Sequence, residues 1–131
     1  MHVRRLMLFA LAGSFALAVP VLAGAECTPR NNPPITVERG PDGKGKVSAE
    51  VVTACEGETL RWVFNGPEGD EMAIVFTSAE DSPFEWDRRT GRTVTGTVKA
   101  GAVKQGQQTT EYDYEVEING QPVDPTIIIQ R

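Results

Sequence analysis

Apolar and acidic residues alternate without a break over 111–118, and this alternation constrains the fold more than any other feature of the chain. Every odd position in the segment is Asp or Glu, and the even positions are Tyr112, Tyr114, Val116 and Ile118. A period of two predicts a strand with one buried face and one solvated face. Asn119-Gly120 follows directly, and this pair suits the positive φ angles of a two-residue hairpin turn. The segment therefore predicts a β-hairpin that packs on a hydrophobic core.

Similar alternating or β-branched stretches recur along the chain, separated by Gly- and Pro-containing turns. They occupy residues 35–38, 47–54, 60–65, 72–77, 93–99 and 126–130. Segment 78–91 is the longest stretch without strand character. About seven short strands with turns between them predict an all-β sandwich. Its core should be centred on Trp62 and include Leu60, Phe64, Ile74, Phe76, Tyr112, Tyr114, Val116, Ile127 and Ile129. In segment 47–54 the face to be buried would carry Val47, Ala49, Val51 and Thr53.

The first 25 residues predict a secretory signal peptide. Arg4 and Arg5 give a positive start, an apolar run of small and aliphatic residues follows, and Ala23-Gly24-Ala25 supplies a cleavage site. The apolar run is shorter than the roughly 20 residues that span a bilayer, which favours cleavage over an uncleaved anchor. Lipid attachment at Cys27 is disfavoured because Glu26, a bulky acid, precedes it. We expect a periplasmic or secreted protein with one domain, residues 26–131.

Cys27 and Cys55 form an even pair in an exported chain, where disulfides persist. A bridge between them would close a loop that stabilises the fold by roughly 3–4 kcal/mol in the chain-entropy model. The alternative is a redox-active pair, but such cysteines usually lie two residues apart near a helix N-terminus. The spacing therefore predicts a structural disulfide.

Cleavage leaves 106 residues with a net charge of −7, because it removes Arg4 and Arg5 and keeps all 18 acidic residues. Bulk charge of this sign disfavours binding to nucleic acid and to anionic lipid. We expect no nucleic-acid partner, no membrane association after cleavage, and a monomer.

The segment Gly57-Glu-Thr-Leu-Arg-Trp-Val-Phe-Asn65, followed by the apolar Met72-Ala-Ile-Val-Phe76, resembles plastocyanin/azurin-type cupredoxins. Tyr112-Asp-Tyr-Glu-Val116 is similar to the penultimate strand of that family, and Asp124-Pro-Thr-Ile-Ile-Ile129 to its closing strand. The resemblance covers roughly residues 35–131. It implies a single cupredoxin-like Greek-key β-sandwich of about seven strands.

The departures from the family fall on its copper ligands. A type 1 centre takes two imidazoles, one thiolate and a weak axial ligand. The family's first His would lie near Asp70, Glu71 and Met72, and its Cys, second His and Met would lie in the closing turn, here 117–125. Neither segment carries Cys or His, and the single His of the chain is His2. The resemblance therefore implies the fold without the copper, and we expect no cofactor.

The 82–92 loop is the best candidate surface for a protein partner, through Phe84, Trp86, Arg88 and Arg89. Aromatic and Arg side chains dominate binding hot spots. The alternative is that Phe84 and Trp86 fold back to cap the sandwich, with Arg88, Arg89 and Arg92 solvated, because aromatic residues in loops usually find a core.

Two groups of acidic residues are expected to be solvent-exposed surface carboxylates, and a functional role for either group is the weaker interpretation. A docking face for a basic partner would use Glu111, Asp113, Glu115 and Glu117, although such charges also discourage pairing between strand edges. A Ca²⁺ site would draw on Asp70, Glu71, Glu80, Asp81 and Asp87, but their spacing does not match the regular Ca²⁺ loop.

Catalysis is not expected, because a Ser nucleophile would lack a His base and a sandwich of this size leaves little room for a cleft. We expect a non-catalytic binding or accessory module without type 1 copper. The alternative is a metal-binding or electron-transfer cupredoxin with an unusual site, for example Cu(I) held by Met72 and carboxylates, although Cu(I) prefers several soft ligands.

Overall fold

The computed structural model describes residues 26–131, so the predicted signal peptide lies outside the described residues. This part of the chain contains eleven strands and no helix. The described residues therefore include no helix that could cross a membrane. The strands are β1 (Ile35–Arg39), β2 (Gly45–Val47), β3 (Val51–Cys55), β4 (Thr59–Phe64), β5 (Met72–Val75), β6 (Arg88–Gly91), β7 (Thr93–Thr97), β8 (Thr109–Asp113), β9 (Glu115–Ile118), β10 (Gln121–Val123) and β11 (Thr126–Gln130).

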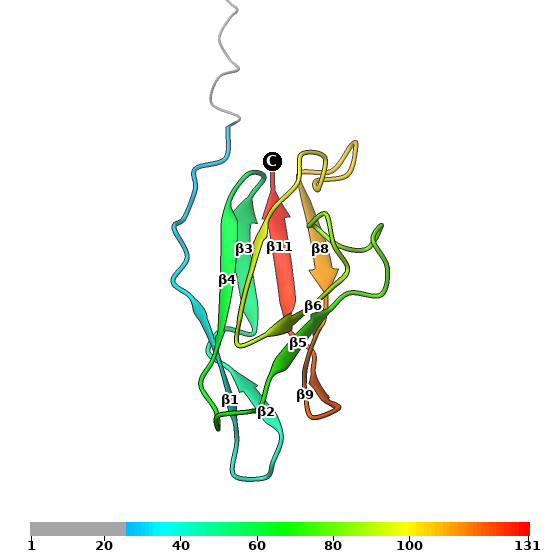
Figure 1. The fold of residues 1–131 in the computed structure, drawn as a ribbon. Coiled ribbons are helices and arrows are strands. Elements are labelled where there is room, and N and C mark those ends of the chain that lie inside the picture. The colour runs from blue at the N-terminus through cyan, green and yellow to red at the C-terminus, as the bar shows by residue number, and fades with distance from the viewer. Residues whose placement is uncertain (1–25) are drawn as a thin grey trace, which may run out of the picture.

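The strands form three hydrogen-bonded sheets. Sheet 1 has the order β2-β1-β4-β7, sheet 2 the order β3-β11-β8, and sheet 3 the order β10-β9-β5-β6. Figure 1 shows the row of β3, β11 and β8, with β9 continuing from β8 toward the opposite end of the molecule. β1 pairs with β4, and β3 with β11, in parallel, so both pairs need crossover connections rather than hairpins. The predicted all-β class is confirmed.

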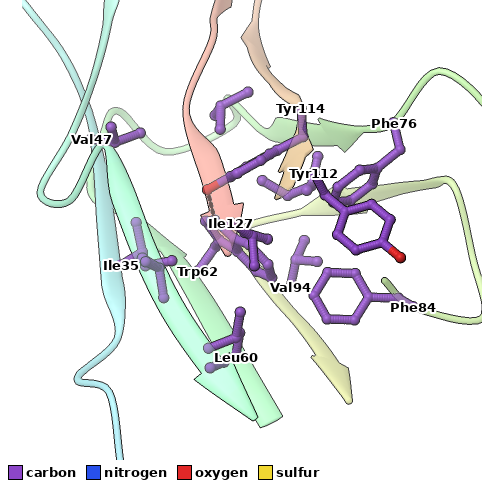
Figure 2. Packing of buried hydrophobic residues seen from close by; sticks show 14 of the residues in the cluster. Ile35, Val47, Leu60, Trp62, Phe76, Phe84, Val94, Tyr112, Tyr114 and Ile127 are labelled. Atoms are coloured by element: carbon purple, nitrogen blue, oxygen red, sulfur yellow. Dashed lines mark hydrogen bonds between the residues drawn. The ribbon is translucent and has the colours of Figure 1, made fainter. Parts of the chain in front are cut away.

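Side chains of sheet 1 and of the other two sheets meet in one buried cluster (Figure 2). Every residue of the predicted core is buried there, and Trp62 is 0% exposed at the centre. Its indole Nε1–H donates to the Tyr114 hydroxyl at 3.0 Å, which satisfies both buried polar groups. The Phe84 ring packs edge-on against Trp62, with ring centroids 5.8 Å apart. The core thus joins strands that are far apart in sequence.

The number of strands differs from the expected seven because several alternating segments change sheets. The stretch 111–118 is divided at Tyr114 into β8, which pairs with β11, and β9, which pairs with β5 and β10. Alternation continues across this point, so the sequence pattern does not reveal the change. The expected turn is confirmed, because Asn119 (φ 52°) and Gly120 (φ 79°) both have positive φ between β9 and β10.

The expected phase of segment 47–54 is wrong beyond its first residues. The chain breaks between β2 and β3, and the alternation restarts one residue out of step. Val51 is therefore 58% exposed, and the buried residues of β3 include Val52 and Ala54. A shift of one residue moves every side chain to the opposite face of a strand, so this short break is enough to invert the prediction.

The predicted disulfide between Cys27 and Cys55 is present, with the two Cα atoms 5.8 Å apart. It joins the start of the described chain to the last residue of β3. The Asn32 side-chain amide donates to the Thr53 carbonyl at 2.9 Å, so the N-terminal segment is attached to β3 at a second point. The bridge and this hydrogen bond together cover one side of β3.

Candidate functional site

The 82–87 part of the candidate loop is a cap on the core. Phe84 is only 1% exposed and lies among the core aromatic rings. The Ser82 hydroxyl is also buried, where it donates to the Trp86 carbonyl at 2.7 Å and accepts from the Phe84 N–H at 3.1 Å. These bonds close the loop into a compact turn around Phe84. This residue was a candidate partner contact, and its burial makes it inaccessible to a partner in this conformation.

Trp86 is half-buried because both faces of its ring are covered. One face stacks on Phe84 at a centroid distance of 4.9 Å, and the Arg89 guanidinium lies 5.0 Å from the ring centroid. Gly96 in β7 lies against the same rings, and a Cβ there would fall 2.8–2.9 Å from Phe84 and Trp86 atoms. The close approach of two aromatic rings to β7 therefore requires Gly at this position.

Arg88 and Arg89 lie in a strand, β6, rather than in the expected loop. The Arg88 guanidinium forms an ion pair with Glu117 at 3.3 Å. Arg89 Nη1 donates to the Thr95 carbonyl of β7 at 3.0 Å. Both arginines are exposed, as expected for the cap arrangement, and each guanidinium also has a polar partner, Arg88 on β9 and Arg89 on β7.

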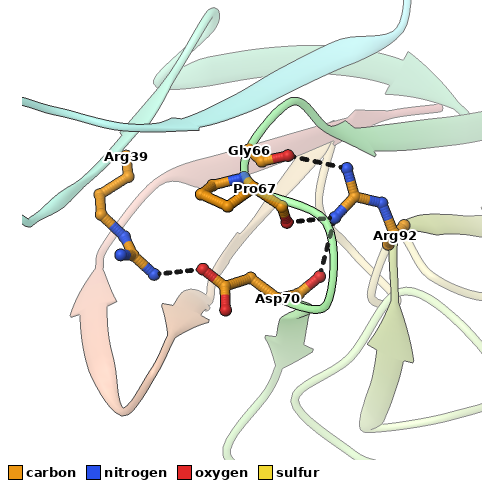
Figure 3. Close-up of polar contacts among 5 residues, drawn as sticks. All are labelled: Arg39, Gly66, Pro67, Asp70 and Arg92. Carbon is orange, nitrogen blue, oxygen red and sulfur yellow. Dashed lines mark hydrogen bonds and ion pairs between the residues drawn. The ribbon is translucent and has the colours of Figure 1, made fainter.

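Arg92 fixes the loop that connects β4 to β5. Its guanidinium donates to the carbonyl oxygens of Gly66, Pro67 and Asp70 at 2.8–2.9 Å, as Figure 3 shows. Arg39 holds the Asp70 carboxylate from the other side at 2.7 Å. These three hydrogen bonds to one guanidinium give the loop a defined shape. The sequence does not reveal them, because the acceptors are backbone carbonyls rather than acidic side chains.

The two segments that carry copper ligands in the resembled family do lie side by side. The loop at Asp70 and Glu71 faces the turn at Asn119 and Gly120 across a shallow hollow of about 310 Å³. Met72 borders this hollow, but its side chain is buried in the core. The available donors are carboxylates and an amide, without imidazole or thiolate, so these residues do not fit a type 1 copper ion.

The residues considered for Ca²⁺ do not come together. Within residues 26–131, no three side chains of His, Cys, Asp or Glu are grouped so that they could hold a metal ion. Asp70 is instead engaged by Arg39.

The outer edge of β8 is open. The Tyr114 N–H donates to Pro125 at 3.1 Å, and the Arg131 N–H donates to Gln108 at 3.0 Å. Antiparallel strands alternate between residue pairs that exchange hydrogen bonds and pairs that do not. The even-numbered residues of β8 therefore face β11. The backbone groups that point away from β11 belong to Thr109, Glu111 and Asp113, and no hydrogen bond from the described residues reaches them.

A hollow of about 610 Å³ lies where this open edge meets β5. β5 pairs with β9 up to Val75 and Glu115, and continued pairing would place Thr77 opposite Asp113. The chain instead bends away at Thr77. The hollow is lined by Val75, Phe76, Thr77, Asp113, Tyr114, Glu115 and Asp124. The Phe76 and Tyr114 rings stack at 5.3 Å and are buried in the core behind the hollow.

The surroundings of the open edge are acidic. Glu111 and Asp113 are exposed, whereas Glu115 is half-buried on β9. Burial raises the pKa of the Tyr112 hydroxyl, and the carboxylates of Asp81 and Glu56 raise it further, so acids also lie near the inner side of β8. The sequence pattern predicted the solvated acids. It gave no sign of the open backbone beside them, because this depends on which strand pairs with β8.

Comparison with known proteins gives a structural likeness alone. No model of a known protein family matches the chain, and no curated protein matches it. Among solved structures, the chain is similar to a proline-to-glycine mutant of amicyanin in its reduced Cu(I) form at pH 4. The two chains are 13% identical, with a TM-score of 0.41, over 86% of this chain and 92% of amicyanin.

Proposed function

We propose that this chain is an exported, non-catalytic binding module on a cupredoxin-like sandwich without type 1 copper, and that it contacts a protein partner. The observation that carries this proposal is the open edge of β8 beside the 610 Å³ hollow. Unpaired backbone groups at a sheet edge are a template for a strand from another chain. An exported protein of this size with such an edge suits an accessory role better than a catalytic one.

The copper part of the proposal rests on the donor set. Cys27 and Cys55 are joined to each other, and the exposed donors of the hollow beside Asp70 are oxygen atoms, since Met72 is buried. Cu(II) added to the purified mature protein should therefore give no thiolate absorption band at about 600 nm after a chelator wash. A band that survives the wash would overturn this part and favour the electron-transfer alternative.

Site-specific photo-cross-linking in exporting cells tests the binding role. A photoreactive residue is placed at Glu111, at Arg88, or at Lys46 on β2 as a control remote in sequence from both regions. We expect a discrete cross-linked protein from Glu111 and only background from Lys46. Background levels at both Glu111 and Arg88 would overturn the binding-module proposal.

The 82–92 segment is a second proposed contact surface, with a smaller accessible area than the sequence suggested. Arg88 and the rim of Trp86 remain exposed at its surface, and Arg residues and aromatic rings favour protein contacts. A cross-link from Arg88 without one from Glu111 would assign the partner to this surface instead.

A further inference from the structure

We infer that the open edge of β8 binds a basic, extended segment of a partner protein by strand addition. This inference rests on the proposed binding function and names the class of partner. It follows from three features of the described residues: an unpaired backbone edge, a hollow in line with it, and the charge along it.

The first feature is the geometry of the unpaired groups. Thr109, Glu111 and Asp113 direct their N–H and C=O groups to the same side of β8, at every second residue. This spacing is the one that an incoming strand needs to form a ladder of main-chain hydrogen bonds. A segment along β8 would meet donors and acceptors over the full length of the strand.

The second feature is the space beside the edge. The hollow opens where β5 leaves β9, between Val75–Thr77 and Asp113–Glu115. An added strand would enter this space in line with β5. Every second side chain of that strand would point inward, toward the stacked Phe76 and Tyr114 rings. Small apolar residues suit these inward positions.

The third feature decides the occupant. Side chains directly opposite one another on neighbouring strands interact, and like charges there are destabilising. Glu111 and Asp113 would face the outward side chains of an added strand, and Glu115 and Asp124 border its path. A second copy of β8 would bring acids against acids. Lys or Arg at alternate positions gives complementary pairs, so the edge selects a basic segment over self-association.

The other edges are less suited to this role. The β6 edge carries Arg88 and Arg89, which would repel a basic segment. The β3 edge is covered at Thr53 by Asn32 and by the Cys27–Cys55 bridge. The β7 edge carries the Arg89 guanidinium on its Thr95 carbonyl. β2 and β10 have three residues each, and β10 includes Pro122, which has no N–H to donate. β8 offers a longer edge without such cover.

The probe is a short capped peptide in which Lys and Val alternate, added to the mature protein with its disulfide intact. We expect chemical-shift changes and slowed amide exchange at Glu111 and Asp113 in NMR spectra, since their N–H groups would become hydrogen-bonded. A peptide with Glu in place of Lys should bind at least about tenfold more weakly because of charge repulsion. Shift changes that map to another part of the molecule would overturn the inference.

A backbone-methylated peptide separates strand addition from general charge attraction. Methylation of the bonding amides keeps the Lys charges but removes the N–H groups, so affinity should fall about tenfold or more. Equal affinity of the methylated peptide would show that charge alone holds it, and would overturn strand addition. This comparison uses the wild-type protein and does not depend on whether any variant folds.

Two substitutions in the protein form a matched pair, one at the β8 edge and one remote from it as a control. Glu111→Lys should weaken the Lys–Val peptide about tenfold, whereas Glu68→Lys, with the same charge change in the exposed loop before β5, should have little effect. Equal loss in the two variants would overturn the assignment to this edge. If the peptide does not bind but cross-links form at Arg88, this inference is overturned. The proposed binding function is then still supported.

Discussion

Strands β7 and β8 look alike in sequence pattern and differ at their edges. Each has five residues, and in each the second and fourth are buried. Each is also the last strand of its sheet. At β7 the Thr95 carbonyl accepts from Arg89, and the Lys99 N–H just beyond donates to Pro83. At β8 the outward groups of Glu111 and its neighbours have no partner from the described chain. An identical burial pattern thus accompanies one guarded edge and one open edge.

The difference comes from the segments that adjoin each strand. The cap beside β7 is anchored by Phe84 in the core and by Trp86 over Gly96, so it can reach the edge of the strand. The first part of the same β5–β6 segment, residues 77–81, has no large apolar residue to hold it against β8. Buried aromatic residues hold a loop in place. The loop beside β7 has such residues and covers the strand edge, whereas the segment beside β8 lacks them and leaves the edge open.

Trp62→Ala should have the largest effect, because Trp62 touches both regions. Its ring packs on Phe84 on the β7 side, and its Nε1–H bonds to Tyr114 on the β8 side. Removing a fully buried Trp should lower the free energy of unfolding by about 3–5 kcal/mol. Urea unfolding measures this loss. A midpoint close to that of wild type would show that the two regions are not joined through this side chain.

Alkaline pH should destabilise the β8 side next. Burial raises the pKa of Tyr114 to about 12 in the folded protein, against the ordinary tyrosine value of 10.0. Between these values the unfolded chain has lost the proton and the folded chain has kept it. Stability is therefore fully present below pH 10 and falls as pH rises toward about 12, by roughly 1.4 kcal/mol per pH unit at most.

Urea unfolding at a series of pH values from about 9 to about 12 measures this slope. Tyr114→Phe removes the titrating hydroxyl and should flatten the slope, although it also leaves the Trp62 N–H without its partner. The same slope in wild type and variant would assign the alkaline loss to other groups.

Gly96→Ala tests the cap on β7. A Cβ at this position would lie 2.8–2.9 Å from Phe84 and Trp86 ring atoms, so the rings must move. Overpacking of this kind should cost about 1–3 kcal/mol. Thr97→Ala, at an exposed position of the same strand, is the control and should cost little. Equal melting temperatures for the two variants would mean that the cap yields freely.

Arg89→Ala should have the smallest effect on stability and the most specific effect on association. The side chain is exposed, so the loss should be within about 1 kcal/mol. The Thr95 carbonyl then loses its partner, and the edge of β7, which carries no acids, opens to pairing with a second copy. Sedimentation velocity should detect self-association that rises with concentration.

Arg88→Ala is the matched control, since it removes the same charge from an exposed ion pair with Glu117. We expect this variant to stay monomeric under the same conditions. Self-association in both variants would attribute the effect to net charge rather than to the opened edge.

Much of the fold could be predicted because it depends on local periodicity. The alternation at Tyr112 and Tyr114 placed both rings in the core, and Asn119-Gly120 placed the hairpin turn. The even Cys count, in a chain expected to be exported, predicted the bridge. Each of these signals acts over a few residues or through a single covalent pair, and long-range packing reinforced them.

The candidate site was less predictable, because it depends on pairing partners. The 82–92 segment showed its aromatic and Arg residues, but composition alone left open whether they cap the core or face solvent. The position of Gly96 beneath Trp86, and of Thr95 beside Arg89, settled the cap. Neither contact has a local sequence signal, since both join segments by side chains that reach across a sheet edge.

The sequence by itself determined the all-β class, the buried face of most strands and the disulfide, because hydrophobic alternation and cysteine chemistry fix these locally. The tertiary structure alone decided where strands change sheets, as at Tyr114, and which edge stays open. A strand's side chains alternate between its two faces, but its backbone bonds lie in the plane of the sheet, toward its neighbours. Burial can therefore be predicted from one strand, whereas an unpaired edge is defined only when every neighbour is in place.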